Sequence, residues 1–236
     1  MSQPRLRLET CTLNGKIWKI DEEQAHHLVR VRRCYTGSLV EGLLSGEKIL
    51  LKLICDGEEV KAEEISRTEE TPAGTEVHLL LGLLKNDQFD DALRFSAETG
   101  VHTIHLLACE RSVPSYEGKK LEEKMNRWNK ILAESTKQAG STIPPILKSP
   151  LKLADINFNE LPKEKYAALL SPLSKNLKDL TIPESLVIAI GPEGDWSLSE
   201  SQKLLDMGFT PVSLGKRILR ASTAVAVACG WLSLVR

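Results

Sequence analysis

The hydrophobic periodicity of the chain changes near residue 70, and this change constrains the fold more than any other feature of the sequence. Before residue 66, apolar and polar residues alternate in short runs, such as residues 5–8 and 16–20, with glycines between the runs. This pattern is typical of short antiparallel strands joined by turns. After residue 76, continuous apolar runs alternate with longer helical segments, as in parallel sheets covered on both faces. The sequence therefore predicts two domains, divided in the polar stretch 66–74.

The first domain, residues 1–71, is predicted to be a small β-barrel. One helical interruption is expected over residues 22–33, behind Asp21 as its N-cap. Residues 1–33 carry seven lysines and arginines against four acids, whereas residues 56–76 carry eight acids against two basic residues. This segregation suits a barrel with one basic face that binds phosphate backbones. An ordinary solvated surface is the alternative, and charge alone slightly favours it.

The second domain, residues 72–236, is predicted to be an α/β domain. Helices are expected over residues 87–99 and 121–139, each closed by a glycine, and after the capping box of Ser197 and Glu200. Four prolines between residues 144 and 162 predict a long irregular crossing. The apolar segment 224–235 predicts a helix buried in the core or at a subunit interface, with neither favoured. Strands are expected over residues 77–84, 103–108, 166–170, 186–190 and 212–214.

Composition and missing motifs exclude several classes of protein. With 42% hydrophobic residues the chain can bury a core, and with a formal net charge of −1 any nucleic-acid contact depends on a local patch. The five cysteines form no C-x-x-C pair, and no apolar run reaches the roughly 18 residues of a membrane helix, so we expect a cytoplasmic protein with reduced thiols. Dinucleotide-binding, P-loop and hydrolase-elbow motifs are missing. His26 and His27 lie near no acid or thiol at ligand spacing, so no metal site is expected.

Two turns that follow predicted strands carry the residues most suited to chemistry. The first, residues 191–197, contains two glycines and leads directly into the capped helix. It is predicted to place backbone amides and a helix N-terminus at the carboxyl edge of a parallel sheet, where ligands bind; a plain strand-to-helix connection is an equal alternative. The second, residues 213–223, carries Lys216, Arg217 and Arg220. The two arginines share a face if this turn is helical, and a solvated surface turn is the alternative.

Five motifs, spread over both predicted domains, together resemble a known family. They are His27-Leu28 with Arg32-Arg33, Glu110-Arg111-Ser112, Gln138-Ala139-Gly140, Gly191-Pro192-Glu193-Gly194, and Leu214-Gly215-Lys216-Arg217-Ile218-Leu219-Arg220. The last two in combination are quite specific. Over nearly its whole length, the chain resembles the RsmE-type methyltransferases of the SPOUT superfamily, which modify uracil nitrogen 3 in small-subunit ribosomal RNA.

The resemblance implies a fold, a cofactor and partners. The expected fold is α/β: a PUA-like β-barrel that binds RNA (residues 1–71), followed by a trefoil-knotted SPOUT domain (residues 72–236). The expected cofactor is S-adenosyl-L-methionine, whose methyl group goes to nitrogen 3 of a uridine. The expected partners are small-subunit ribosomal RNA or its assembly particle, and a second copy of the chain bound through the C-terminal domain. No membrane contact is expected.

The resemblance also implies roles for individual residues. Arg217 and Arg220 are expected to stabilise charge that develops on the base, with Glu193 orienting one of these arginines or the base. The residues expected at the cofactor are Leu170, Ser171, Pro172, Gly191, Pro192, Glu193, Gly194, Leu214, Gly215, Ile218, Leu219 and Ala221. The residues expected to contact RNA are Arg5, Arg7, His27, Arg30, Arg32, Arg33, Arg111 and Gln138.

Two departures from the family pattern leave other interpretations open. Ser141 and Ser222 stand where the family usually has arginine and glutamate. The chain is therefore also consistent with an RNA-binding relative of the same architecture that has weak or no catalytic activity. A third interpretation is an α/β enzyme acting on a small nucleotide or acid, for which the turn at residues 191–197 suffices. We rank both below the methyltransferase.

Overall fold

The chain forms two compact units in a computed structural model that describes residues 3–57, 59–71, 74–112 and 116–235. The first unit comprises residues 1–72 with residues 136–143, and the second comprises residues 73–135 with residues 144–236. The grouping of residues 136–143 with the first unit is not expected from the sequence. It reflects hydrogen bonds such as the one from the Thr142 amide to the Glu70 carboxylate at 2.5 Å.

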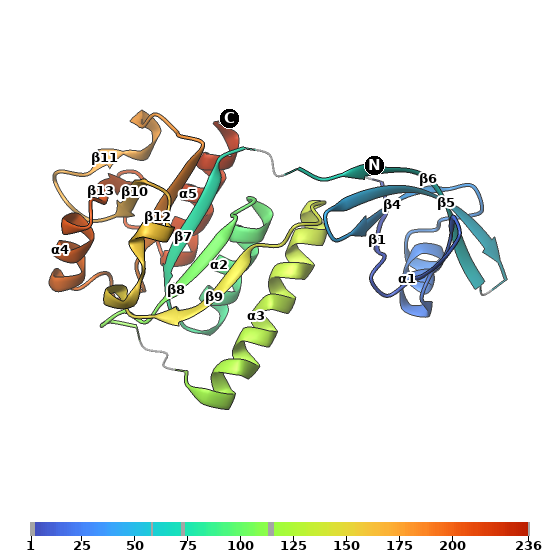
Figure 1. Ribbon diagram of the computed structural model, residues 1–236, viewed down its shortest axis with the longest axis horizontal. Coiled ribbons are helices and arrows are strands. Elements are labelled where there is room, and N and C mark those ends of the chain that lie inside the picture. The colour runs from blue at the N-terminus through green and yellow to red at the C-terminus, as the bar shows by residue number, and fades with distance from the viewer. Residues whose placement is uncertain (1–2, 58, 72–73, 113–115, 236) are drawn as a thin grey trace. The chain divides into compact units, whose positions relative to one another are not determined.

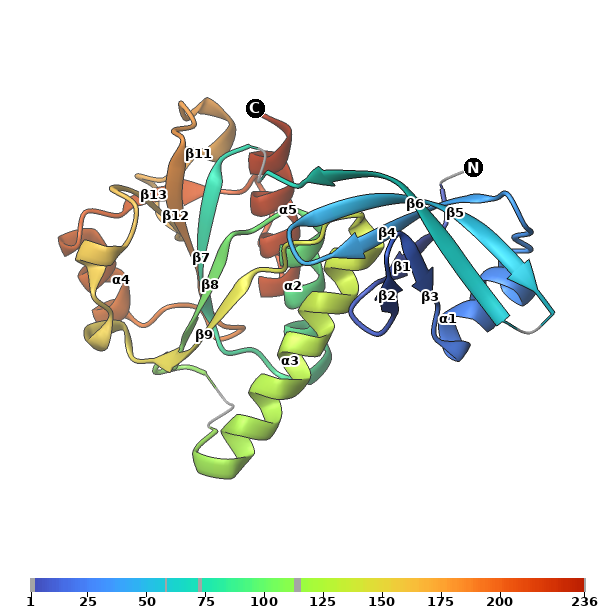
Figure 2. The same cartoon turned by 45° about the vertical axis from the view of Figure 1, so that its right-hand side comes forward.

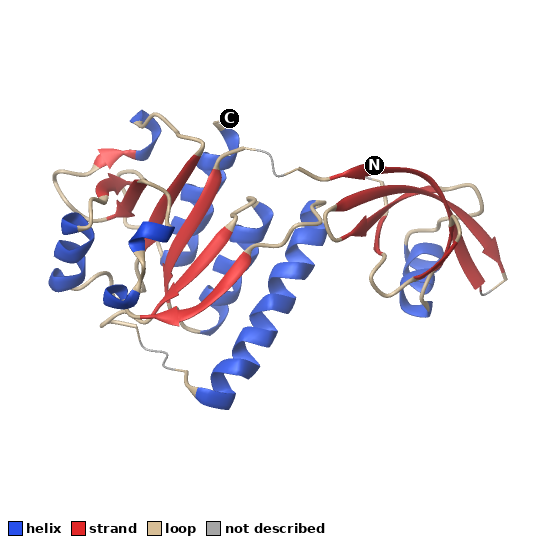
Figure 3. Ribbon diagram, viewed as in Figure 1, coloured by secondary structure: helices blue, strands red, loops and turns tan. Residues whose placement is uncertain are grey.

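The first unit is built mainly of strands with one short helical segment (Figure 3). Its elements are β1 (Arg5–Arg7), β2 (Thr12–Asn14), β3 (Ile17–Lys19), α1 (Glu22–His26), η1 (His27–Val31), β4 (Leu39–Leu44), β5 (Glu47–Asp56) and β6 (Glu59–Glu69). In the described residues these strands make one six-stranded sheet in the order β1-β4-β5-β6-β3-β2. β1 runs parallel to β4, so the expectation of purely antiparallel pairing is wrong there. Parallel strands need a long connection between them, and the segment through β2, β3 and α1 provides it.

The core of the first unit follows from the alternation of its strands. Along β5, Ile49, Leu51 and Leu53 are fully buried while their neighbours are more exposed, which is the period-2 pattern of a sheet with one covered face. Asp21 caps α1, since its Oδ1 accepts a hydrogen bond from the Gln24 amide at 2.9 Å. The expected single helix over residues 22–33 is divided: α1 ends at His26 and the wider π-helical turn η1 follows.

The second unit is a parallel α/β structure (Figures 1 and 2). Over the described residues it contains one seven-stranded sheet, and every strand pair in it is parallel. The strand order is β11-β13-β10-β12-β7-β8-β9. Its elements are β7 (Glu76–Gly82), α2 (Asn86–Glu98), β8 (Thr103–Leu107), α3 (Gly118–Ala139), β9 (Ile146–Leu151), η2 (Leu153–Asp155), η3 (Phe158–Glu160), β10 (Glu164–Ala168), β11 (Lys175–Asn176), η4 (Leu177–Asp179), β12 (Ser185–Ile190), α4 (Leu198–Asp206), β13 (Thr210–Ser213) and α5 (Ala221–Leu234).

Helices cover both faces of this sheet, which explains the continuous apolar runs in the sequence. On one face, Leu79 and Leu81 of β7 pack in a core with residues of α2, α3 and α5. On the other face, Leu80 packs in a second core with Leu204 of α4 and Leu153 of η2. Because successive strand residues point to opposite faces, every position of β7 from Leu79 to Leu81 is buried. The expected α/β class is confirmed.

The predicted helices of the second unit are confirmed, whereas two strands are missed. Gly100 and Gly140 follow α2 and α3 with φ of +74° and +83°, and both hydrogen bonds of the Ser197–Glu200 capping box form at the start of α4. The expected irregular crossing contains β9, in which Pro150 is tolerated because β9 lies at the edge of the sheet. β11, at the other edge, has only two residues and leaves no periodic signal. None of the described helices is long and apolar enough to cross a membrane.

Candidate functional site

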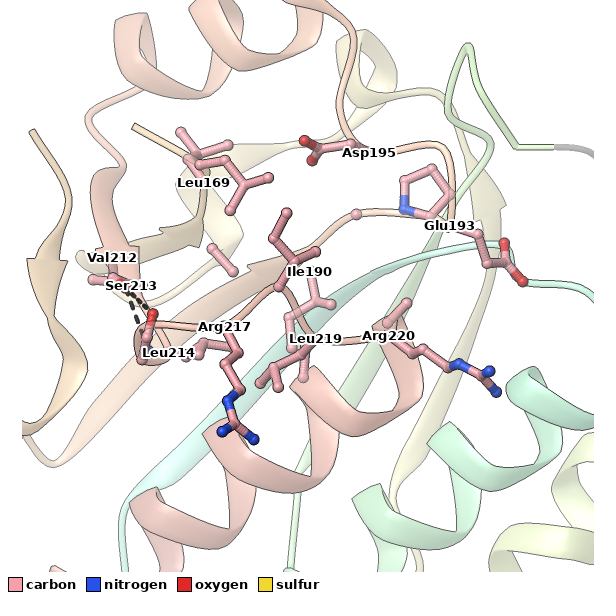
Figure 4. A pocket seen from close by; sticks show the side chains of 18 of the residues that line it. Leu169, Ile190, Glu193, Asp195, Val212, Ser213, Leu214, Arg217, Leu219 and Arg220 are labelled. Atoms are coloured by element: carbon pink, nitrogen blue, oxygen red, sulfur yellow. Dashed lines mark hydrogen bonds between the residues drawn. The ribbon is translucent and has the colours of Figure 1, made fainter. Parts of the chain in front are cut away.

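A cavity of about 390 Å³ opens at the carboxyl ends of β10, β12 and β13, within the second unit (Figure 4). Its walls come from residues 168–170, 190–193, 195, 212–215 and 217–221, with Gln88 from α2 and Ala224 from α5. Ligand-binding cavities commonly have volumes of about 300–1,000 Å³. Ligands of open parallel sheets bind at this edge, so the cavity lies where the sequence predicts a binding site.

The loop after β12 is closely packed against the end of β10. A Cβ atom on Gly191 would lie 3.1 Å from the ring of Trp196. The Trp196 indole nitrogen donates a hydrogen bond to the Ala168 carbonyl at 3.2 Å. Asp195 adopts a φ of +61°, and its carboxylate accepts a hydrogen bond from the Trp196 amide at 2.8 Å. A side chain at position 191 would therefore press against the ring of Trp196, and the glycine lets the main chain of the loop line the cavity.

The same loop also meets the end of β7 and the start of α2. A Cβ atom on Gly82 would lie 2.7 Å from the backbone nitrogen of Pro192, so the two chain segments are in direct contact. Glu193 accepts a hydrogen bond at 2.8 Å from the backbone amide of Lys85, the N-cap residue of α2. We expected Glu193 to orient an arginine or the base. In the structure, its Oε1 is bound to the backbone at the start of α2, and the expected role stays a prediction.

Arg217 and Arg220 both line the cavity, but the loop that carries them is not helical. Arg220 is the N-cap residue of α5, and the two side chains extend in different directions (Figure 4). The condition under which the two arginines would share a helical face is therefore not met. Both residues are exposed, and neither guanidinium makes a hydrogen bond or ion pair with another described residue. The two cations are available to a ligand.

Arg111 is an exposed residue whose side chain contacts the loop after β12. Its guanidinium donates hydrogen bonds to the carbonyls of Gly194 and Trp196, at 3.1 and 3.2 Å. A Cβ atom on Gly194 would lie 3.0 Å from the Arg111 Cβ. Because these contacts fix the carbonyls of the loop, Arg111 holds the wall of the cavity in place, a role that the sequence does not predict.

Gln88 is a cavity residue that sequence analysis misses. Its Oε1 is buried and has no hydrogen-bond partner among the described residues, although the residue lines the cavity. A buried acceptor without a partner costs about 1–3 kcal/mol. This oxygen therefore marks a position at which a bound ligand can offer a donor. No sequence motif signals it, because Gln88 is an ordinary residue in the first turn of α2.

The cavity contains most of the residues expected at the cofactor. Ser171, Pro172 and Gly194 are not part of its wall, and neither is Ser197 at the start of α4. The expected residues that do line the cavity are Leu170, Gly191, Pro192, Glu193, Leu214, Gly215, Ile218, Leu219 and Ala221. Two further wall residues, Asp195 and Ser213, fall in the two turns that sequence analysis singles out. The wall residues outside the expected loops are Gln88, Ala168, Leu169, Ile190, Val212 and Ala224.

The residues expected to contact RNA in the first unit differ in their exposure and in their hydrogen-bond partners. His27, Arg30, Arg32 and Arg33 are exposed and lie on or directly after η1. Arg5 is held by the Glu41 carboxylate at 2.9 Å and by the carbonyl of Gln138 at 2.9 Å. Arg7 lies half-buried in β1, and the Gln138 side chain is exposed. The exposed basic residues thus gather around η1, whereas Arg5 is held within the fold.

Comparison with known proteins identifies the family. A family model described as an RNA methyltransferase domain matches residues 70–233. The chain belongs to this family of RNA methyltransferases. The methyltransferase is 32% identical over 214 residues to the ribosomal RNA small subunit methyltransferase E of Synechocystis sp., covering 87% of this chain and 69% of that protein. It is 28% identical to the protein of the same name from Buchnera aphidicola, covering 95% of this chain and 90% of that one.

Solved structures give the fold of this RNA methyltransferase. A protein of Legionella pneumophila, solved in complex with the bound cofactor SAM, is 26% identical and superposes with a TM-score of 0.79 over 98% of this chain and 97% of that chain. A ribosomal RNA small subunit methyltransferase E from Neisseria gonorrhoeae has the same TM-score at 24% identity, over 98% of this chain and 97% of that chain. The fold is therefore the SPOUT fold expected from the resemblance.

Proposed function

We propose that the chain transfers a methyl group from S-adenosyl-L-methionine to nitrogen 3 of a uridine in small-subunit ribosomal RNA. The observation that carries this proposal is the cavity that three loops form at the carboxyl ends of β10, β12 and β13, in a member of an RNA methyltransferase family. The relatives from Synechocystis and Buchnera are named for the small ribosomal subunit, and the Legionella protein was solved with SAM, which supports the same substrate and cofactor.

The residues of the cavity fit this cofactor. S-adenosylmethionine supplies a methyl group bound to a positively charged sulfur atom. The wall offers the main chain of the loop after β12 and apolar side chains such as Leu169, Ile190 and Leu219. The unpaired Oε1 of Gln88 offers an acceptor for a polar hydrogen of the ligand. Pockets for small molecules bind their ligands mainly through apolar contacts, with a small number of polar groups that fix the orientation.

The chemistry requires alignment and charge stabilisation rather than a covalent intermediate. Nitrogen 3 of uracil carries a proton and lies on the pairing edge, so the base must be unpaired or flipped out of a helix. Nitrogen 3 first gives up its proton to solvent. The nitrogen–carbon bond then forms as the carbon–sulfur bond breaks, and the sulfur becomes a neutral thioether. Negative charge develops on the pyrimidine before transfer. We propose that Arg217 and Arg220, which have no other described side-chain partner, stabilise this charge.

We propose that the first unit binds the RNA backbone as a PUA-like domain. His27, Arg30, Arg32 and Arg33 are exposed around η1, and basic side chains bind phosphates with a strong dependence on salt. Arg5 contributes less to this surface, because its guanidinium is already paired with Glu41. This arrangement predicts RNA binding that weakens as each of the exposed arginines is removed and as the salt concentration rises.

We also propose that the methyltransferase acts in the cytoplasm as a homodimer joined through its second unit. α5 is apolar on most of its surface, and Val227 and Leu234 are 40% and 82% exposed at its C-terminal part. Exposed apolar side chains that form a contiguous patch mark an interface, and we propose that these two belong to such a patch. The relatives named for ribosomal RNA support the proposed compartment, because the enzyme has to reach that substrate.

Mass spectrometry of nucleosides tests the proposed reaction directly. Small-subunit ribosomal RNA from cells that lack the gene is expected to lose one 3-methyluridine, and the wild-type gene is expected to restore it. Purified chain and S-adenosylmethionine should methylate RNA or small subunits isolated from the deleted cells. Unchanged 3-methyluridine in the deleted cells contradicts the proposed substrate, and RNA binding without methyl transfer supports the inactive relative instead.

A further inference from the structure

Three histidines and one glutamate gather at the amino ends of β7 and β8 in the second unit. Glu76 and His78 lie on β7, His102 directly precedes β8, and His105 lies on β8. The register pairs His78 with Thr103 and Leu80 with His105, so the side chains of His78 and His105 point to the same face of the sheet. None of these residues contributes to the cavity or to the exposed basic surface around η1.

Three of these side chains converge as a set of metal ligands does. The Glu76 carboxylate lies 2.9 Å from the His78 Nε2 and 3.5 Å from the His102 Nδ1. One ligand atom from each residue lies within 4.8 Å of the other two. Zinc bonds of about 2.0–2.2 Å to nitrogen and oxygen place tetrahedral ligand atoms ~3.3 Å apart. Small rotations of exposed side chains therefore suffice to close the three ligands around one ion.

His105 is the fourth residue of this group, and its ring contacts His78. Its Nε2 lies 3.2 Å from the Nδ1 of His78, and the two rings stack with centroids 5.5 Å apart. A histidine that binds a metal through one nitrogen almost always donates the proton on its other nitrogen to a fixed acceptor. When His78 uses its Nε2 as ligand, its Nδ1 carries the proton and His105 accepts it. His105 is thus a positioning residue for His78.

The exposure of the ligands fits entry of an ion from solvent. The side chain of His78 is only 12% exposed, whereas those of His102 and Glu76 are 38% and 48% exposed. His78 is therefore held in place between His102, at 5.4 Å between ring centroids, and His105. The other two ligands stand at the surface, where they can adjust and where a water molecule can fill a fourth position.

We propose that Glu76, His78 and His102 bind one Zn²⁺ ion, with His105 holding His78 in the ligand tautomer. Imidazole nitrogens and a carboxylate oxygen are the ligands that Zn²⁺ takes in sites of this size. The site is at the opposite end of β7 from the cavity: Gly82, which contacts Pro192, is four residues beyond His78, or about 13 Å along the strand. The ion therefore joins the starts of β7 and β8 and takes no part in methyl transfer.

Calorimetric titration of the full chain with Zn²⁺ tests this site, after the accessible thiols have been alkylated because thiolates also bind zinc. We expect one equivalent to bind and the melting temperature to rise with added Zn²⁺. His102→Ala should abolish or weaken this binding, and His105→Ala should weaken it by about 10- to 100-fold, as loss of a hydrogen-bond partner of a ligand does. A double variant, His26→Ala with His27→Ala, is the matched control and should bind as wild type.

Glu76→Gln tests the same zinc site with a smaller change to the structure than removal of a histidine from the sheet. It removes one charge from an exposed side chain, so its circular dichroism should match that of wild type while its affinity for Zn²⁺ falls at least 10-fold. Methyl transfer by the Glu76, His102 and His105 variants should stay at the wild-type rate. Failure of Zn²⁺ to bind, or binding that is equally tight in Glu76→Gln and His102→Ala, overturns the proposal. A loss of binding in the His26 and His27 control also overturns it.

Discussion

The carboxylate of Glu193 accepts a hydrogen bond from the backbone amide of Lys85 at 2.8 Å, which joins the loop after β12 to the first turn of α2. Lys85 is the N-cap residue of α2, and its own side chain makes no capping hydrogen bond. Gln88, whose Oε1 is unpaired at the cavity, is three residues further along the same turn. Through this hydrogen bond, the position of the loop depends on the position of α2. Helix α2 carries Gln88, whose Oε1 is the one buried side-chain acceptor without a partner among the described residues that line the cavity.

This contact predicts that Glu193 acts by positioning rather than by touching the base. Glu193→Ala removes the acceptor and should raise the KM for S-adenosylmethionine about 10-fold, the effect of losing one hydrogen bond to a charged group. Glu193→Gln keeps an acceptor at the same place and should recover most of the affinity. Steady-state kinetics with both substrates measure the difference. Equal losses in the two variants, confined to kcat, contradict a positioning role.

Gly191 is predicted to be essential for cofactor binding because of the ring behind it. A valine there places carbon atoms against Trp196, whose ring lies 3.1 Å from the position of a Cβ, and displaces the hydrogen bond from Trp196 to Ala168. Gly191→Val should therefore abolish binding of S-adenosylmethionine in calorimetry. Gly230→Ala is the control: its Cβ meets only Thr99 at 3.9 Å. Normal affinity in Gly191→Val shows that the cofactor binds elsewhere.

The two cavity arginines are predicted to act on the chemical step. Arg220→Ala should lower turnover on RNA by about 10²-fold, as removal of one donor to a developing negative charge does. Arg217→Ala should lower it to a similar or smaller extent. Binding of S-adenosylmethionine should change little in either variant, and Lys216→Ala, outside the cavity wall, should turn over as wild type. Single-turnover assays with labelled cofactor separate the effects, and wild-type turnover in Arg220→Ala refutes the assignment.

Two of the five cysteines are predicted to resist alkylation in the folded chain. Burial raises the pKa of Cys229 to about 12, and burial with the nearby Glu200 carboxylate raises the pKa of Cys109 to about 12. Both thiols therefore stay protonated and unreactive at about pH 8, since the thiolate is the nucleophile. Mass spectrometry after treatment with iodoacetamide should find Cys109 and Cys229 unmodified, and modified once the chain is denatured. Rapid alkylation of either one in the native chain contradicts the described packing.

Local signals in the sequence predicted most of the second unit. The capping box of Ser197 and Glu200, the glycines at positions 100 and 140, and the continuous apolar runs all act within a few residues, and the structure contains each of them. Strand β9 was not predicted, because a proline such as Pro150 disfavours a strand except at the edge of a sheet. Edge position is a property of the whole sheet, so it cannot be predicted from the residues of the strand itself.

The features of the site that sequence analysis missed depend on contacts between distant segments. Glu193 and Lys85 are 108 residues apart, and the partners of Arg111 are more than 80 residues away from it. Glu76, His78 and His102 come together only because β7 and β8 are paired in the sheet. The loop that carries Arg217 and Arg220 contains no proline, and Gly215, with a φ of +127°, is its one break in helical pattern.

A crystal structure of the chain with S-adenosylmethionine is the most direct measurement. The cofactor should lie between residues 168–170, 190–195 and 212–221, with one of its polar hydrogens facing the Gln88 Oε1 and its methyl group facing open space beside Arg217 or Arg220. Density for the cofactor at another place on the chain, or none at saturating concentration, contradicts the proposed site and the function built on it.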